Sequence, residues 1–378
     1  MKVFHLADTH LGYSAYRKVT DEGVNQREID VYDAFAQCID HAVKTKPDLV
    51  LHAGDLFDSV RPTNRAITIA IQQILRLSKE NIPFIVISGN HETPKLKETG
   101  NIFRIFEHLQ NVYPIHNNRY EAVSIPLKDE TVIVHAIPQC QSPEDFDANF
   151  KKISIDKNAD YNLLLAHGAV AGIKEFKMNE FNELFIPVKN LEKDFDYIAL
   201  GHYHMHTKLQ ENAFYPGSTE YLSFTEANTQ KGFLELNLGR TLKHRFVPLK
   251  TRIMVDAPVI DCSTRSLEQI LREVKEALNA INPVDKIIRI RLENIPLHLQ
   301  RAIDFHQIRE YGKTAMHLEI KTTHITPEKT VLHDGYLMKS LSDEFEKFIA
   351  TQRYPEKKIL LPLGLSYINK IEEQEKKP

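Results

Sequence analysis

The sequence predicts an α/β fold with more than one domain, and three observations support this. Short, nearly continuous apolar runs such as Leu49–Ala53 and Phe84–Ile87 are typical of strands covered on both faces. Between such runs lie segments such as Asp30–Thr45, where apolar residues spaced four apart indicate amphipathic helices. A chain of 378 residues is long enough to bury a large core and to contain more than one domain.

The strand and helix candidates of the first 249 residues alternate along the chain. We expect strands at Val3–Ala7, Leu49–Ala53, Phe84–Ile87, Val132–His135, Leu163–Ala166 and Tyr197–Leu200. We expect helices at Asp30–Thr45, Arg65–Leu77 and Asn101–Leu109. The last of these is rich in large apolar side chains, which predicts a core helix; the alternative is a partly exposed self-association face.

A smaller α+β domain is expected over residues 250–326. Its expected elements are strands at Ile253–Val255, Val259–Ile260, Ile287–Leu292 and His317–Lys321 and a helix at Leu267–Leu278. Apolar and basic residues alternate in Ile287–Leu292, which is typical of a half-exposed strand. Arg289 and Arg291 of this strand could face the phosphates of a nucleic acid. The alternative is a solvated surface balanced by nearby glutamates.

Residues 327–378 form a third segment, in which helices are expected at Leu337–Ala350 and Leu365–Lys370. Its apolar run Leu360–Leu365 is unusual in an otherwise polar tail and predicts docking on the body of the protein or on a partner. Just before this segment, Gly312–Thr314 resembles the end of a phosphate-binding loop. Gln307 stands where that loop needs glycine, so no nucleotide cradle is expected.

Composition and charge constrain the setting in which the protein works. The chain is 42% hydrophobic and 26% charged, as in an ordinary soluble protein, and its net charge of -3 gives no general attraction for DNA or membranes. Cys38, Cys140 and Cys262 are few and widely separated, which predicts buried thiols in a reducing cytosol. No signal peptide and no membrane helix are expected, so we expect a cytoplasmic protein.

Polar side chains follow the strands of the first domain at the points where the strands end. They form five blocks along the chain: Asp8 with His10, Asp55, Asn90 with His91, His167, and His202 with His204. A glycine adjoins four of the five blocks and lets the backbone turn and pass close to a bound ion. Because ligands bind where the strands of open α/β sheets end, we expect the five blocks to meet at one edge.

The side chains in these blocks are chemically suited to metal ions. Aspartate, histidine and asparagine supply oxygen and nitrogen without a thiolate, which suits Mn²⁺, Fe or Zn²⁺ and disfavours a structural zinc site. Seven ligands, all of these side chains except His91, are too many for one ion and suit two ions bridged by a carboxylate, about 3.5–4 Å apart. His5, His52 and His135 lie within apolar strands and are predicted to be buried and hydrogen bonded. His206 is predicted to be exposed or outside the ligand set.

The order of the five blocks resembles that of the calcineurin-like metallophosphoesterase superfamily. Five stretches resemble motifs of the Mre11/SbcD nuclease family more closely: Asp8–Gly12, Arg27–Phe35, Leu51–Asp58, Gly89–Glu92 and Tyr215–Glu220. The similarity is dense over residues 1–235, and beyond them only the layout is similar. It implies a metallophosphoesterase β-sandwich flanked by helices over residues 1–249. A capping DNA-binding domain over residues 250–326 and a linker and ATPase-partner-binding segment over residues 327–378 would follow.

The resemblance also implies a role for each residue of the site. One ion would be held by Asp8, His10, Asp55 and His204, and the other by Asp55, Asn90, His167 and His202, with Asp55 bridging. His91 would assist phosphoester cleavage without binding an ion, either by stabilising the transition state or by protonating the leaving oxygen. Some family members have a histidine where this chain has Asp58, so Asp58 receives no role.

By the same resemblance, the protein would be a DNA phosphodiesterase with two divalent ions, expected to be Mn²⁺. It would act as a 3′ to 5′ double-strand exonuclease and a single-strand endonuclease in double-strand break repair. It would work as a homodimer with a Rad50/SbcC-type ATPase, in the cytoplasm and at the nucleoid in a prokaryote. The alternative is a small-substrate or phosphoprotein metallophosphoesterase, which would share all five blocks but would not need the second domain or the tail. A non-catalytic scaffold is a further alternative, although such chains tend to lose ligands.

Overall fold

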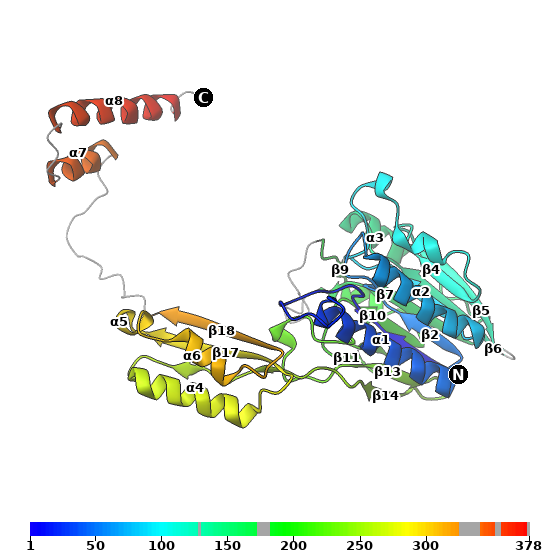
Figure 1. The fold of residues 1–378 in the computed structure, drawn as a ribbon. Coiled ribbons are helices and arrows are strands. Elements are labelled where there is room, and N and C mark those ends of the chain that lie inside the picture. The colour runs from blue at the N-terminus through cyan, green and yellow to red at the C-terminus, as the bar shows by residue number, and fades with distance from the viewer. Residues whose placement is uncertain (128–129, 172–181, 325–340, 352–356, 376–378) are drawn as a thin grey trace. The chain divides into compact units, whose positions relative to one another are not determined.

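The computed structural model describes residues 1–127, 130–171, 182–324, 341–351 and 357–375. The chain divides into two compact units, Met1–Thr323 and His324–Pro378, which are described separately (Figure 1). The first unit contains a large β-sandwich and a smaller sheet. The predicted domain boundaries after residues 249 and 326 stay predictions.

One face of the sandwich is a six-stranded sheet with the order β14–β13–β1–β2–β3–β4. Strands β1 to β4 are parallel, and β13 and β14 extend the sheet with antiparallel pairings. The bounds are Lys2–Leu6 (β1), Leu49–His52 (β2), Phe84–Ile87 (β3), Val112–Ile115 (β4), Gly232–Asn237 (β13) and Lys243–Pro248 (β14). The parallel strands are joined by helical crossovers, as the alternation of strand and helix patterns predicts.

The other face is a six-stranded sheet with the order β11–β12–β10–β7–β6–β5. Its four inner strands are parallel, and the edge strands β5 and β11 are antiparallel to their neighbours. The bounds are Glu121–Leu127 (β5), Glu130–Ile137 (β6), Tyr161–His167 (β7), Tyr197–Gly201 (β10), Thr207–Gln210 (β11) and Ala213–Tyr215 (β12). A separate two-stranded sheet pairs Ala169–Val170 (β8) with Phe185–Ile186 (β9).

The two large sheets pack face to face through alternate side chains of their strands. Leu49 and Leu51 of β2 lie in one apolar cluster with Leu163 and Leu165 of β7, and all four are buried. Helices cover the outer faces: Gln26–Thr45 (α1) and Asn64–Lys79 (α2) on the first sheet, and Pro143–Lys151 (α3) on the second. The predicted sandwich flanked by helices is therefore confirmed.

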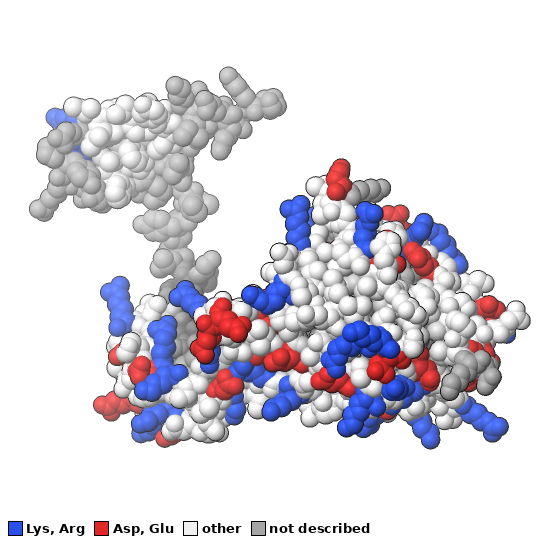
Figure 2. All heavy atoms as spheres, turned by 45° about the vertical axis from the view of Figure 1, so that its right-hand side comes forward, with Lys and Arg blue, Asp and Glu red and all other residues white. Residues whose placement is uncertain are grey.

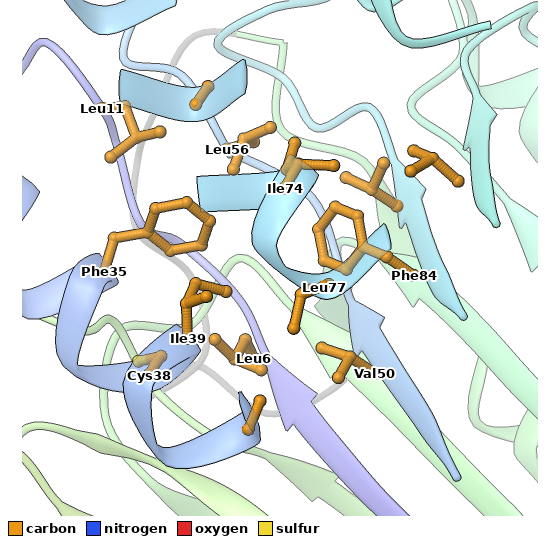
Figure 3. Packing of buried hydrophobic residues seen from close by; sticks show 14 of the residues in the cluster. Leu6, Leu11, Phe35, Cys38, Ile39, Val50, Leu56, Ile74, Leu77 and Phe84 are labelled. Atoms are coloured by element: carbon orange, nitrogen blue, oxygen red, sulfur yellow. The ribbon is translucent and has the colours of Figure 1, made fainter. Parts of the chain in front are cut away.

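The packing of α1 and α2 on the first sheet is shown in Figure 3. Phe35 of α1 and Leu77 of α2 point toward Leu6 and Phe84 of the strands, and all four side chains are buried. Each helix begins at a side-chain cap, because Asn25 accepts from the backbone N–H of Arg27 and Thr63 accepts from that of Ala66.

The helix predicted at Asn101–Leu109 is shorter than expected. It is a 3₁₀ helix, Ile102–Phe106 (η2), of the kind often used as a connector. Phe103 and Phe106 are fully buried, which confirms the core interpretation for these two side chains, whereas Ile102 and Ile105 are partly buried. Where the structure describes the chain, the other 3₁₀ segments are Lys97–Thr99 (η1), Val188–Leu191 (η4) and Phe224–Glu226 (η5).

The smaller sheet of the first unit is built around its longest strand, β17, which pairs with β15, β16 and β18. The bounds are Met254–Asp256 (β15), Ile260–Asp261 (β16), Leu267–Ile281 (α4), Ile287–Ile295 (β17), Leu297–Gln300 (α5), Phe305–Tyr311 (α6) and His317–His324 (β18). This small domain has its own core. Met254, Ile287 and Met316 also form an apolar cluster with Tyr221 of the sandwich, so the two parts are packed together.

In the described residues of the second unit there are two helices, Leu341–Thr351 (α7) and Lys357–Glu375 (α8). A Cβ atom at Gly364 would collide with the ring of Phe345, so glycine allows α7 and α8 to pack closely. The helix predicted at Leu365–Lys370 is part of the longer α8, and the first four residues of the helix predicted at Leu337–Ala350 lie outside the described residues. Within the described ranges, no helix is both long and apolar enough to cross a lipid bilayer.

The three cysteines and the surface charges follow the sequence pattern. Cys38, Cys140 and Cys262 are buried free thiols, as predicted.

On the face shown in Figure 2, lysine and arginine side chains are interspersed with aspartate and glutamate over both the sandwich and the small domain. On this face, attraction for a polyanion would therefore depend on individual positions rather than on a general field.

Candidate metal centre

The predicted site residues converge at the carboxyl ends of parallel strands from both large sheets. Asp8 and His10 follow β1, Asp55 follows β2, and Asn90 and His91 follow β3. His167 ends β7, and His202 and His204 follow β10 on the opposing sheet. Except for Asn90 and His91, these residues are buried. The sandwich thus brings groups nearly 200 residues apart to one edge.

The ligand atoms of these residues fall into three overlapping groups. Asp8, His10 and His204 each offer one atom within 4.8 Å of the other two, and so do Asp55, His167 and His202. The third group is His10, Asp55 and His91. Oδ1 of Asn90 joins the second group, because it lies 2.9 Å from His167 Nε2 and 3.2 Å from His202 Nδ1. The first two groups each contain three members of one of the two ligand sets that the family resemblance implies; the ligand sets themselves stay a prediction.

Four of the predicted ligands have a left-handed backbone, which is uncommon for residues with a side chain. The φ angles are 51° for Asp8, 47° for His10, 54° for Asp55 and 103° for His202. Such conformations each cost about 1–3 kcal/mol and persist where surrounding contacts enforce them. Their concentration here is typical of a functional site, and the sequence carried no signal for it.

Two glycines allow the sheets to approach each other beside these residues. Gly54 has a φ of 94°, and a Cβ atom added to it would collide with the ring of His167. A Cβ atom on Gly201 would collide with the carbonyl oxygen of Ala53 on the opposite sheet. Gly54 has the positive φ of the predicted turn, whereas the close approach at both glycines is to the opposite sheet; the predicted approach to a bound ion stays a prediction.

Each of the four histidines among the predicted ligands donates one ring N–H to an oxygen atom. Nδ1 of His10 donates to Asp58 Oδ1 (3.1 Å), and Nδ1 of His167 donates to the carbonyl oxygen of Ala53 (2.8 Å). Nε2 of His202 donates to Glu183 Oε1 (2.9 Å), and Nδ1 of His204 donates to Glu226 Oε1 (3.1 Å). This pattern is typical of metal-binding histidines, because it fixes the tautomer and directs the other nitrogen toward the ion.

The residues present therefore fit divalent ions. Nε2 of His10 is buried and makes no hydrogen bond with any described residue, although the other ring nitrogen is firmly bound. Burying such a polar atom is costly unless a further group satisfies it. Together with two buried carboxylates and the absence of sulfur from the donor set, this supports ions with a preference for oxygen and nitrogen.

The two carboxylates and His167 form a strongly coupled buried group. Asp55 Oδ2 lies 3.2 Å from His167 Nε2, and the Asp8 carboxylate accepts from the backbone N–H of His202 (2.9 Å). Burial alone would raise the pKa of Asp55, but the charges of His167 and His91 hold it well below its usual range. Burial alone would lower the pKa of His167, but Asp55 and Asp8 raise it to about 9.

His91 lies beside the two ligand groups at the solvent side of the centre. Its side chain is 28% exposed, its backbone N–H donates to Asp55 Oδ1 (3.0 Å), and its ring Nδ1 donates to the carbonyl oxygen of Asp58 (3.1 Å). Asp58 therefore contacts both His10 and His91, a position for which the sequence predicted no role. The contacts hold the His91 ring at the edge of the centre.

The remaining histidines lie where the sequence predicts. His5, His52 and His135 are buried and hydrogen bonded to Tyr197, Thr9 and Tyr120 respectively. His206 is exposed, and its Nδ1 donates to the carbonyl oxygen of Tyr215. These four predictions are confirmed.

The two arginines proposed for DNA binding differ in their surroundings. Arg289 is held by Asp256 (2.5 Å) and lies over the ring of Phe224, and its side chain is 14% exposed. Arg291 lies 3.3 Å from Asp256 and is 36% exposed. Arg289 therefore has a role in joining the small domain to the sandwich, and Arg291 is the more accessible cation of the pair.

Sequence reasoning missed the acidic residues behind the histidines. Glu183 and Glu226 are buried, and each accepts from a predicted ligand. Glu226 also closes a capping box with Ser223, and this Ser-x-x-Glu spacing is the one local signal in the sequence. That signal marks a helix start, so the contact with His204 could not be read from it.

Comparison with known proteins identifies relatives of the chain. Residues 1–206 match the family model described as calcineurin-like phosphoesterase. The protein is 32% identical to a DNA double-strand break repair protein Mre11 of Methanococcus maripaludis over 241 residues, covering 61% of this chain and 60% of the relative. It is 30% identical to the Mre11 protein of Sulfolobus acidocaldarius over 304 residues, covering 78% and 75%.

A third Mre11 protein, from Methanosarcina mazei, is 27% identical over 348 residues, which cover 88% of this chain and 52% of the relative. The chain thus spans about half to three quarters of the length of these three relatives. A solved dimetal phosphatase from Danio rerio aligns with 65% of this chain and 95% of its own at a TM-score of 0.34 and 10% identity.

When chelator-treated protein binds metal, the number of protons released should depend on the protonation of His167. With a pKa of about 9, His167 is protonated near neutral pH, whereas an ion requires the lone pair of a neutral imidazole. We expect release of about one proton at roughly pH 7.5, declining as the pH rises through 9. Calorimetric titration in two buffers of different ionisation enthalpy measures this release. Equal heats in both buffers would contradict the prediction, and His206→Gln serves as a control that should behave as wild type.

Proposed function

Because the chain belongs to the calcineurin-like phosphoesterase family, and within it to the Mre11 proteins, we propose that it is a metal-dependent nuclease. Its reaction would be the hydrolysis of DNA phosphodiester bonds, as a 3′ to 5′ exonuclease on double-stranded ends and an endonuclease on single strands. The observation that carries this proposal is the pair of ligand groups at the sandwich edge, with His91 beside them. Break repair is the process named for the relatives.

Two divalent ions, expected to be Mn²⁺, would be held by the residues at this edge. Asp8, His10, Asp55 and His204 would hold one ion, and Asp55, Asn90, His167 and His202 the other. When bound, such ions polarise a phosphoryl oxygen and lower the pKa of water. The two aspartates compensate part of the positive charge, and the remainder favours an anionic substrate.

His91 is proposed to move a proton during cleavage. Its Nδ1 carries a hydrogen, because this atom donates to the carbonyl oxygen of Asp58. Nε2 is therefore the atom that would exchange a proton with the leaving oxygen. The backbone N–H of His91 donates to Asp55 Oδ1, which keeps His91 next to the residue that would bridge the ions.

The small domain over residues 250–326 is proposed to contact DNA near the centre. It packs on the sandwich through the cluster of Met254, Ile287 and Tyr221, so it would present its surface in a defined orientation. A phosphoesterase for small substrates would not need such a domain. A DNA substrate would place the activity in the cytoplasm, and at the nucleoid in a prokaryote.

Residues 327–378 are proposed to bind a Rad50/SbcC-type ATPase. Ile359, Leu363 and Tyr367 of α8 are 67%, 51% and 63% exposed, although they are large and apolar. Exposed apolar residues spaced four apart are the pattern of a helix that docks in a partner's groove. A homodimer, formed through helices of the sandwich, completes the proposed assembly.

Replacing His91 should separate metal binding from catalysis. His91→Ala is expected to retain two ions per chain and to lose about 10²–10⁴-fold in nuclease rate, because a general acid is removed. Digestion of end-labelled duplex DNA with Mn²⁺, beside a small chromogenic phosphodiester, measures the rate, and elemental analysis counts the ions. Fewer than two ions in the variant would make His91 a ligand. Turnover of only the small ester by the wild type would favour a small-substrate phosphoesterase.

Reversing the charge of Arg291 should weaken DNA binding. Arg291→Glu is expected to reduce the slope of log affinity against log salt by about one, the value for one lost phosphate contact. Fluorescence anisotropy at several salt concentrations measures it. Arg272→Glu on α4, an equally large charge change in the same domain away from β17, is the matched control. Identical slopes for the two variants would show that Arg291 makes no phosphate contact and belongs to a solvated surface.

Charged substitutions on α8 should weaken binding of the ATPase. Leu363→Glu combined with Tyr367→Glu is expected to weaken the complex at least about 10-fold, since charges would replace buried apolar contacts. Basal nuclease activity should be unchanged. Co-purification with the ATPase tests this, with Leu297→Glu as a control because that leucine is 62% exposed on α5. Full recovery of the ATPase by the double variant would refute the assignment.

A further inference from the structure

A buried carboxylate and a buried ammonium group lie directly behind His204. Glu226 Oε1 accepts from His204 Nδ1 (3.1 Å), and Glu226 Oε2 pairs with Lys231 Nζ (2.5 Å). We propose that Glu226, held in place by Lys231, is the positioning residue that fixes the His204 ring with Nε2 facing the metal centre. This inference rests on the proposed function, because it concerns the residues that would hold His204 in place as a ligand of one of the two proposed ions.

The surroundings of Lys231 are complete. An ammonium group has three N–H donors, and Lys231 uses them on Glu226 Oε2, on Ser218 Oγ (2.8 Å) and on the carbonyl oxygen of His204 (2.8 Å). Lys231 and Glu226 are only 2% and 1% exposed. Because all three N–H donors are used, the Lys231 ammonium group is held in one position. Its contact with Glu226 Oε2 therefore holds the Glu226 carboxylate in place as well.

The Glu226 carboxylate is held equally firmly by the backbone. Oε1 accepts from the N–H of Ser223 (3.1 Å) and Oε2 from the N–H of Leu222 (3.3 Å). Its two oxygens therefore cannot rotate away from His204. The ring and the backbone carbonyl of His204 are both bound by this assembly, so the assembly determines where His204 Nε2 lies.

A contribution to the stability of the fold does not by itself explain the buried Glu226–Lys231 ion pair. Removing two charges from water is expensive, and well-packed apolar residues of the same volume are often as stable or more so. Fixing the tautomer and orientation of a ligand is a function that an apolar pair could not perform. The geometry therefore favours positioning over a purely structural role.

The other ion would have separate supports. His202 donates to Glu183 and His167 donates to the carbonyl oxygen of Ala53, and neither contact involves Glu226 or Lys231. Loss of the Glu226 assembly should therefore weaken the ion held with His204 and leave the second ion in place. A general defect of folding would weaken both ions.

The test is calorimetric titration of the chelator-treated full chain with Mn²⁺. Replacing the pair by Glu226→Leu with Lys231→Met is expected to weaken one of two Mn²⁺ equivalents by about 10–100-fold and the other by less than about 3-fold. Glu183→Leu, which removes the acceptor for His202 Nε2–H, should weaken the other Mn²⁺ equivalent. Arg252→Met, which removes a different, partly buried cation of the same unit, is the control and should change neither. Equal weakening of both equivalents, or of neither, would overturn the proposal.

A second measurement reports the ring itself. In ¹⁵N-histidine-labelled, metal-free protein, His204 should be a pure Nδ1–H tautomer in the wild type and a mixture in the double variant. Should the double variant fail to fold, Glu226→Gln replaces it, because an amide oxygen still accepts from Nδ1–H. That variant should keep the tautomer and lose less than about 10-fold in affinity. A wild-type tautomer in the double variant, or loss of the tautomer in Glu226→Gln, would refute the positioning role.

These measurements are independent of DNA cleavage. A wild-type protein that binds two ions with the expected tautomer but leaves DNA intact would refute the proposed nuclease and leave the Glu226 assignment standing. A wild-type protein that cuts DNA, together with a double variant that binds both ions normally, would support the nuclease and refute the positioning role of Glu226.

Discussion

The functional edge of this protein depends on the close approach of two β-sheets at positions that have no side chain. Gly201 lies against the carbonyl of Ala53, and Gly54 lies against the ring of His167. The same approach lets His167 donate to the carbonyl oxygen of Ala53 across the sandwich (2.8 Å). Any side chain at these glycines would separate the sheets, and the ligand group of Asp55, His167 and His202 could not form.

Once the sheets meet, the polar groups are held by contacts beyond the ligands themselves. Asp8 accepts from the backbone of His202, Asp55 accepts from the backbone of His91, and Asp58 holds the ring of His10. These contacts cross between sheets and between strands. They also explain how left-handed backbones persist at Asp8, Asp55 and His202, since each conformation is stabilised from several directions.

Much of this arrangement could be predicted from sequence, because it follows from local rules. The apolar run Phe84–Ile87 forms a strand with the expected bounds, and polar residues next to glycine lie at strand ends where ligands gather. The contribution of Glu226 and Glu183 could not be predicted, since it depends on how distant segments face each other. The helix expected at Asn101–Leu109 was wrong in length, because an apolar pattern reports burial but not the number of turns.

The pairing of β1 has a consequence for the order in which the chain matures on a ribosome. This strand lies between β2, which is made soon after it, and β13, which is made more than 200 residues later. Throughout that interval of translation, one edge of β1 has no neighbour from its own sheet, and contacts of such long range form slowly. The residues that face the edge of the sandwich, from Asp8 to His204, are likewise spread over most of this interval. All of the predicted ligands are therefore present only after more than half of the chain has been synthesised, so a shorter nascent chain could not assemble the complete site.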